Sequence, residues 1–279
     1  MIARRAGALA LALFLYLPME ITSHRNDKVR LVRTLQARRK VREEERLFVI
    51  EGVRLGEEAA RAGVVPRFVF YTQSAEVDGR MKSLLSALGG MGAPCYEVSE
   101  SVMEICSDVE TPQGLLAVVP ISSLPRSSHP TLTLILDQLR DPGNLGTILR
   151  TALAAGVEEV LLAPGTVDAT NPKVVRAGAG AHFRLPVAAL EWEAIAEAVA
   201  GCRVYLAQTE GDRIYTEVDW SESVAVIVGG EAAGAGRRAR ALALESVFIP
   251  MTGEVESLNA AVATAVVLFE VVRQRRGLG

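Results

Sequence analysis

The feature that most constrains the fold is a regular alternation of apolar runs and helical segments after residue 131. Runs such as LTLILD (132–137) and VAVIVG (224–229) are apolar along their whole length rather than at alternate positions. Strands of that kind are buried on both faces, and strands separated by helices form a mostly parallel sheet covered on both sides. The sequence therefore predicts an α/β domain over 132–279. Its other predicted strands are 160–163, 204–207 and 246–250, and its predicted helices are 145–155, 173–179, 192–200 and 258–275.

Two of these helices carry further signals. Gly156 follows the helix 145–155 at the position where a residue with positive φ ends a helix. The last helix, from Leu258 to about Arg275, has apolar residues recurring at helical spacing. They form one stripe of Leu258, Val262, Ala265, Val266, Phe269 and Val272.

A smaller α/β domain is predicted over residues 19–120. A helix over Asn26–Lys40 has Val29, Val32 and Leu35 on one side. Further helices are expected at 52–62 and 78–88, and strands at 47–50, 67–71 and 114–119. The segment ISSLPRSSHPT (121–131) is rich in serine and proline and is the predicted linker between the domains.

Residues 1–18 have two interpretations. Two arginines precede an apolar run of about twelve residues, whereas a membrane span needs about twenty. The run resembles the start of a secretory signal, but no small-x-small cleavage site follows it. Either translation starts at Met19 and residues 1–18 are a mis-started or dispensable extension, or they form a genuine membrane-directing segment. The mass of the native protein distinguishes the two.

The cysteine and histidine pattern argues against a metal site. Cys95, Cys106 and Cys202 form no C-x-x-C pair, and the three histidines are widely scattered. A disulfide framework and a zinc ribbon are therefore not expected, and a reducing compartment, the cytoplasm, is. No metal is predicted.

The net charge of −3, from 30 Lys+Arg and 33 Asp+Glu, hides a strongly basic segment. Between His24 and Arg42 the chain has eight basic residues and one acidic residue, a local charge of 8 − 1 = +7. Such a segment is a candidate for binding nucleic-acid phosphates. The alternative is a solvated helix face neutralised by the glutamates at 43–45. The predicted phosphate contacts here are Arg25, Lys28, Arg38, Arg39 and Lys40.

Three loops follow predicted parallel strands at their carboxyl ends, where such sheets bind ligands. In the first loop, Asn144 is placed to cap the next helix, and Arg150 is an isolated cation among Leu, Ile, Thr and Ala. The alternative for Arg150 is an ordinary solvated arginine.

The second loop, VIVGGEAAGAG (226–236), has four glycines but fits neither G-x-G-x-x-G nor the P-loop pattern, so neither of those phosphate-binding mechanisms applies. Its Glu231 suits a cationic or hydroxyl-bearing ligand better than a polyphosphate.

The third loop and helix, IPMTGEVESLNAAVATAVVLFE, occupy residues 249–270. Ser257 or Asn259 marks the start of the helix. Ser257 is therefore either a plain helix cap or a functional hydroxyl.

The segments NLGTILR, VGGEAAGAG and IPMTGEVESLN, in this order, resemble the three motifs of the SpoU (TrmH-type) RNA 2′-O-ribose methyltransferases of the SPOUT class. The resemblance covers essentially all of 132–279. The basic stretch that begins SHRNDKVRLVRTLQARRK is similar to the substrate-binding domain often fused to such enzymes.

This resemblance implies a deep trefoil knot, one of the rare exceptions to unknotted chains, and a homodimer with the active site at its interface. The cofactor implied is S-adenosylmethionine, bound by Gly230, Glu231, Ile249, Met251, Ser257 and Leu258. The polar active-site positions implied are Asn144, Arg150, Glu231, Ser257 and Asn259. Within 171–187, Arg176 is expected to approach RNA. Family members often carry a serine near the position of Gly178, which leaves a polar contact there in doubt.

The implied reaction transfers a methyl group from the cofactor's sulfonium to a ribose 2′-oxygen. An arginine matching Arg150 has been suggested as the general base in this family, but a guanidinium has a pKa above 12. The alternative is that Arg150 holds the adjacent phosphate and stabilises the developing alkoxide while water takes the proton.

Ribosomal RNA is the expected substrate, with tRNA as the alternative. A non-catalytic RNA-binding protein of the same fold is the second hypothesis, and the intact polar positions argue against it. A nucleotide-dependent oxidoreductase lacks its glycine fingerprint.

Overall fold

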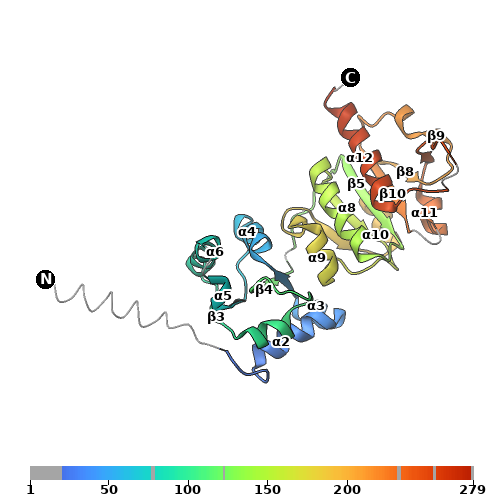
Figure 1. Ribbon diagram of the computed structural model, residues 1–279. Helices are drawn as coiled ribbons and strands as arrows, with labels where there is room; N and C mark the ends of the chain where they lie inside the picture. Colours follow the sequence, from blue (N-terminus) through green and yellow to red (C-terminus); the bar gives the residue numbers. More distant parts are fainter. Residues whose placement is uncertain (1–20, 77–78, 122, 231–233, 254–255, 278–279) are drawn as a thin grey trace, which may run out of the picture. The chain divides into compact units, whose positions relative to one another are not determined.

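The computed structural model describes residues 21–76, 79–121, 123–230, 234–253 and 256–277. The chain divides into two compact units, Met1–Ile121 and Ser122–Gly279 (Figure 1). The division falls at the start of the predicted linker. Residues 1–18, for which two interpretations were given, lie outside the described residues. Within the described part of the chain, no helix is both long and apolar enough to cross a membrane.

In the first unit, four described strands form a mixed sheet in the order β1-β4-β2-β3. They are β1 (Leu47–Glu51), β2 (Phe68–Tyr71), β3 (Cys95–Glu97) and β4 (Leu115–Pro120). β4 is antiparallel to both neighbours, and β2 is parallel to β3. The helices are α2 (Asp27–Ala37), α3 (Arg39–Glu45), α4 (Val53–Arg61), α5 (Gln73–Glu76), α6 (Gly79–Gly90) and α7 (Glu100–Cys106). Apolar residues of α2 and α7 share one buried cluster with the sheet.

The predicted helix over Asn26–Lys40 is two helices. Arg38 has an extended backbone (φ −126°, ψ 111°) that ends α2 and begins α3. The turn lets Arg42 fold back, and its Nη1 donates a hydrogen bond to the Leu35 carbonyl oxygen at 2.6 Å. Arg42 is only 3% exposed, so it stabilises the turn and does not belong to the solvent-facing basic surface.

In the second unit, seven described strands form one sheet, in which every pairing is parallel. The order is β7-β6-β5-β10-β8-β11-β9. The strands are β5 (Leu132–Asp137), β6 (Glu159–Leu162), β7 (Val187–Ala189), β8 (Arg203–Ala207), β9 (Arg213–Ile214), β10 (Val224–Gly229) and β11 (Glu245–Phe248). The predicted parallel α/β sheet is confirmed.

Alternate residues of each strand point to opposite faces of this sheet. Because the strands are apolar throughout, both faces are covered by helices. One face packs against α8 (Pro142–Ala155), α9 (Pro172–Gly178) and α12 (Ala260–Arg275), and α8 contacts both of the others (Figure 1). The other face packs against α10 (Trp192–Ala198) and α11 (Arg237–Leu242). Two short 3-10 helices occupy Ala181–Phe183 and Tyr215–Glu217. Gly156 ends α8 at φ 78°, as predicted.

Three of the six residues in the predicted apolar stripe are exposed in this chain. Leu258 is 39% exposed, and Val262 and Phe269 are each 50% exposed. The residues of α12 that enter the core are instead Ala260, Ala261, Thr264, Val267, Leu268, Glu270 and Val271. The helix is therefore apolar on two sides, and only one of them packs against its own chain.

The three cysteines form no disulfide. Burial raises the pKa of all three thiols and brings that of Cys106 to about 12, so they remain protonated near neutral pH. Among the described residues, no cluster of three or more His, Cys, Asp or Glu side chains is arranged to hold a metal ion.

Candidate functional site

A cavity of about 580 Å³ lies at the carboxyl ends of β8, β10 and β11. Its described walls are residues 207–209 after β8, the two ends of the glycine loop (229–230 and 234–235) after β10, and Ile249, Met251 and residues 256–259 after β11. Of the predicted cofactor residues, five line it: Gly230, Ile249, Met251, Ser257 and Leu258. The structure thus gathers residues from two distant motifs into one cavity. The sixth, Glu231, lies outside the described residues.

The glycine loop packs so tightly that side chains are excluded at two positions. A β-carbon on Gly230 would lie 2.2 Å from the Gln138 carbonyl oxygen, and one on Gly229 would lie 2.4 Å from the Ala235 nitrogen. Both neighbours are backbone atoms, which cannot move aside easily. These glycines therefore permit close backbone approach, as the sequence predicted.

The far end of this loop is fixed from the centre of the sheet. Asp137, at the end of β5, is buried, and its Oδ2 accepts a hydrogen bond from the Gly236 backbone N–H at 2.6 Å. Gly230 and Gly234 also form an antiparallel bridge across the loop. The floor of the cavity is thus a backbone surface held by hydrogen bonds.

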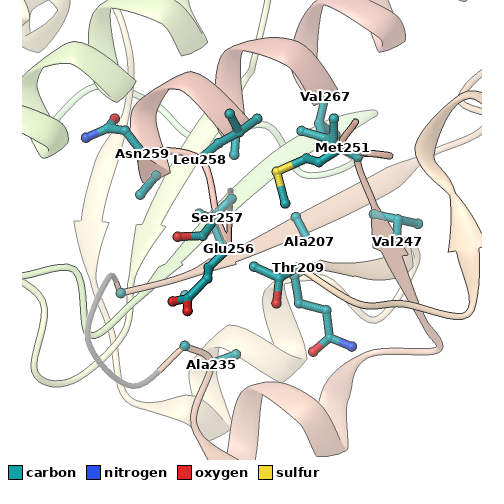
Figure 2. Close-up of a pocket in the computed structure, with 18 of the residues that line it drawn as sticks. Ala207, Thr209, Ala235, Val247, Met251, Glu256, Ser257, Leu258, Asn259 and Val267 are labelled. Atoms are coloured by element: carbon teal, nitrogen blue, oxygen red, sulfur yellow. The ribbon is translucent and has the colours of Figure 1, made fainter. Parts of the chain in front are cut away.

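Asn259, not Ser257, caps the last helix. Its Oδ1 accepts hydrogen bonds from the backbone N–H groups of Ala261 (2.9 Å) and Val262 (3.3 Å). The Ser257 hydroxyl is therefore not used as a cap, and Ser257 lines the cavity. In Figure 2, Ser257 and Glu256 lie between Asn259 and the part of the wall formed by Ala235. Of the two roles left open for Ser257, the structure excludes the plain cap.

The predicted cap role of Asn144 is wrong. Asp141 caps α8, and its Oδ1 accepts a hydrogen bond from the Asn144 backbone N–H at 2.7 Å. The helix starts earlier than expected because Pro142, which has no N–H to satisfy, occupies its first position. The Asn144 side chain instead accepts a hydrogen bond from Asn259 Nδ2 at 3.0 Å. This contact joins the first and third motifs at the edge of the cavity.

Arg150 lies on the exposed face of α8 and is not among the residues that line the cavity. It makes no ion pair with the part of the chain that the structure describes. The structure of a single chain therefore does not bring Arg150 together with Ser257 and Asn259.

Arg176 is partly buried in the last turn of α9. At Gly178, a β-carbon would lie 2.9 Å from Cε1 of His182, whose Nε2 lies 2.8 Å from the Ala169 carbonyl oxygen. Burial lowers the pKa of His182, so the ring is neutral near pH 7. The imidazole thus occupies the space into which a side chain at position 178 would extend.

The basic segment of the first unit is partly neutralised. Arg39 Nε lies 2.7 Å from Glu43 Oε1, and Lys40 Nζ lies 3.7 Å from Glu44 Oε1. For these two residues the alternative of a neutralised helix face applies.

Three other arginines of this segment are exposed and have no ion-pair partner in the described residues. They are Arg25, Arg33 and Arg38. Lys28 is partly buried, and its Nζ lies 4.9 Å from the centre of the Tyr96 ring. The exposed positive charge is therefore smaller than the sequence count of +7.

Four polar residues that line the cavity were not predicted as site residues: Gln208, Thr209, Arg240 and Glu256. Gln208 and Thr209 directly follow β8, so the rule about the carboxyl ends of parallel strands could have found them. Arg240 lies in α11 (Arg237–Leu242), after the glycine loop, and only the fold turns it back toward the cavity.

The comparisons with known proteins agree with this geometry. The model of the SpoU rRNA Methylase family matches residues 131–269, and the MRM3-like substrate binding domain matches residues 26–117. The Bacillus subtilis 23S rRNA (guanosine(2553)-2′-O)-methyltransferase RlmP is 32% identical over 256 residues, which are 90% of this chain and 98% of that protein. The human mitochondrial rRNA methyltransferase 3 is 32% identical over 307 residues, with 88% of this chain and 72% of that protein covered.

A solved structure of the AdoMet-bound rRNA methyltransferase from Sinorhizobium meliloti superposes with a TM-score of 0.81 at 30% identity. The match covers 93% of this chain and 98% of that one. The relatives thus extend over both units rather than over the second alone. This chain belongs to the SpoU rRNA methylase family, as the three motifs predicted.

Proposed function

We propose that this protein transfers a methyl group from S-adenosylmethionine to a ribose 2′-hydroxyl in RNA, with ribosomal RNA as the substrate. The observation that carries the proposal is that residues of the second and third motifs line one cavity, with the Asn144–Asn259 contact at its edge. Relatives that cover both units are named as rRNA methyltransferases, which favours rRNA over tRNA.

The cavity fits the proposed cofactor. Gly229 and Gly230 bring bare backbone to its wall, and Ile249, Met251 and Leu258 supply apolar side chains. Glu256 is the one carboxylate among the lining residues that the structure describes, and it suits a cationic ligand. S-adenosylmethionine, when bound, supplies an electrophilic methyl group on a positively charged sulfur.

The chain's own polar groups are suited to placing the ribose. The Ser257 hydroxyl lines the cavity, and Asn259 fixes the orientation of the Asn144 amide through its Nδ2–H. Holding the acceptor hydroxyl in one orientation supplies much of the acceleration in such a transfer. Arg150 would hold the adjacent phosphate and stabilise negative charge on the 2′-oxygen, since a guanidinium does not readily accept a proton at neutral pH.

We infer that the protein acts as a homodimer. Leu258 at the cavity and Val262 and Phe269 on α12 are exposed, and exposed large apolar side chains at helical spacing indicate an interaction surface. A second copy packed there would also explain how Arg150, exposed outside the cavity of its own chain, acts in catalysis. The implied trefoil knot is part of the same proposal. It is supported by the packing of 249–259 against the glycine loop in one cavity.

We infer a cytoplasmic location, supported by three cysteines that form no disulfide. Fractionation of cells that express the tagged chain tests it, and recovery with the membrane fraction would contradict it.

The activity is tested by incubating the purified protein with methyl-labelled S-adenosylmethionine and either total rRNA or total tRNA, and mapping the labelled nucleotide. We expect label on one ribose of rRNA. Ser257→Ala is the matched variant: because Ser257 does not cap α12, we expect its loss to leave the melting temperature unchanged. Label in tRNA alone would show that tRNA, not rRNA, is the substrate. If neither RNA pool is labelled but the protein binds RNA, the non-catalytic hypothesis is favoured.

We propose that the exposed arginines of the first unit that have no ion-pair partner among the described residues bind RNA phosphates. Replacing Arg25, Arg33 and Arg38 together by glutamine removes three potential phosphate contacts. The slope of log affinity against log salt is then expected to fall in magnitude by about 2 to 3, because each contact contributes roughly 0.7 to 0.9. Arg30→Gln is the control, since Arg30 already pairs with Asp27 at 2.5 Å. An unchanged slope in the triple variant would exclude this surface.

A further inference from the structure

Arg240 connects two walls of the cavity through a single guanidinium. It lies in α11, directly after the glycine loop, and its side chain turns back toward β8. Its Nε donates a hydrogen bond to the Ala235 carbonyl oxygen at 3.1 Å, and its Nη1 donates to Gln208 Oε1 at 2.9 Å. Ala235, Gln208 and Arg240 all line the cavity.

These two walls diverge where sheet hydrogen bonding ends. β10 and β8 pair in parallel only as far as Val228 opposite Ala207. Beyond that point the chain after β8 turns toward β11, since the Gln208 N–H donates to the Val247 carbonyl oxygen at 3.0 Å. The glycine loop turns the other way, toward Gln138. The Arg240 guanidinium thus crosses between segments that the sheet no longer holds together.

The other arginines of α11 do not make this connection. Arg238 pairs with Glu193 on α10. Arg237 is exposed and has no ion-pair partner in the part of the chain that the structure describes. Arg240 is also the one cation among the described residues that line the cavity.

The positive charge of Arg240 by itself would weaken, not strengthen, binding of the proposed cofactor. The reactive group of the proposed cofactor is a sulfonium cation, which a nearby guanidinium repels. The two hydrogen bonds of Arg240, made by different nitrogens of one rigid planar group, instead fix the distance between the walls. A lysine ammonium has a single nitrogen and cannot reproduce that fork.

We propose that Arg240 is a positioning residue for the cofactor, which fixes the glycine loop against the end of β8 and thereby sets the affinity for S-adenosylmethionine. The inference rests on the proposed function. The role assigned to Arg240 is to position the walls of the cavity, since its two hydrogen bonds go to Ala235 and Gln208.

Calorimetric titration of S-adenosylmethionine without RNA tests the proposal. Arg240→Gln is expected to weaken cofactor binding about tenfold, equivalent to about 1.4 kcal/mol. In steady-state kinetics, KM for the cofactor should rise by a similar factor, while kcat at saturation changes less than twofold. Gln208→Ala is expected to weaken binding as well, and the double variant to be no worse than Arg240→Gln, because both changes remove the same connection. Arg240→Lys is not expected to restore affinity. Arg237→Gln, on the same helix, is the control and should bind as the unchanged protein does.

Three outcomes would overturn the proposal: affinity within twofold of the unchanged protein in Arg240→Gln, full rescue by Arg240→Lys, or a fall in kcat with unchanged affinity. The melting temperature of each variant shows whether the fold is intact, and Gln208→Ala tests the same connection without altering α11. Failure of the unchanged protein to bind S-adenosylmethionine would instead refute the proposed function.

Discussion

Asn259 makes two kinds of contact that substitution can separate: one caps a helix, and the other orients Asn144 in the proposed function. Its Oδ1 caps α12 by accepting from two backbone N–H groups, and its Nδ2 donates to Asn144. Asn259→Ala removes both. Loss of an N-cap costs about 1 kcal/mol, and loss of the side-chain hydrogen bond costs about another 1 kcal/mol. For a unit of this size, a total of about 2 kcal/mol lowers the melting temperature by about 4 to 8 °C.

Asn259→Ser keeps a capping oxygen but has no amide to donate to Asn144. We expect its melting temperature to fall by only about 2 to 4 °C, from the lost hydrogen bond to Asn144 alone, since serine and asparagine are similarly good caps. Methyl transfer is expected to fall at least tenfold in both variants, because the Asn144 amide loses the group that orients it.

Thermal denaturation followed by circular dichroism, together with single-turnover transfer of labelled methyl groups, measures the two effects. Full activity in Asn259→Ser would refute the role of the amide contact. An unchanged melting temperature in Asn259→Ala would refute the role of the cap.

Three further predictions concern the cavity floor, the dimer and pH. Gly230→Ala places a β-carbon against the Gln138 carbonyl oxygen and is expected to abolish cofactor binding in calorimetry; unaltered affinity would show that the loop moves aside at little cost. Phe269→Glu puts a charge in the exposed apolar stripe. We expect it to shift the protein to monomers in sedimentation equilibrium and to abolish methyl transfer. If the unchanged protein is itself monomeric, the proposed dimer is contradicted. Burial lowers the pKa of His182 below its ordinary value of 6.5, so the unfolded chain binds more protons in acid and the free energy of unfolding should fall as the pH drops below about 6.5. Urea titrations at pH 7.5 and 5.5 measure this, and His182→Gln should show a smaller difference between the two.

Local sequence determined the strands and most helices of the second unit. The strands 132–137 and 224–229 were predicted with the bounds they have, because a strand buried on both faces is apolar at every position. The three loops were also found from the sequence, since each follows such a strand. The short strands β7 and β9, of three and two residues, were missed because so few residues show no periodicity.

Tertiary structure decided what each polar side chain does. Asn144 and Asn259 are 115 residues apart, and no local pattern indicates that their amides meet. Arg42 counted toward a basic segment in the sequence, but the turn at Arg38 buries it. Charge counts cannot anticipate this, because the cost of burying an arginine depends on acceptors supplied by the fold.

The last helix shows most clearly which properties the sequence determined and which the tertiary structure decided. Its sequence established an amphipathic pattern and an apolar stripe, and by itself determined that a helix would form there. The sheet and α8 decided which apolar side packs against the chain: Val267, Leu268 and Val271 enter the core, while Leu258, Val262 and Phe269 remain outside. Burial is a property of the surface that a helix meets, and a one-dimensional pattern does not contain that surface.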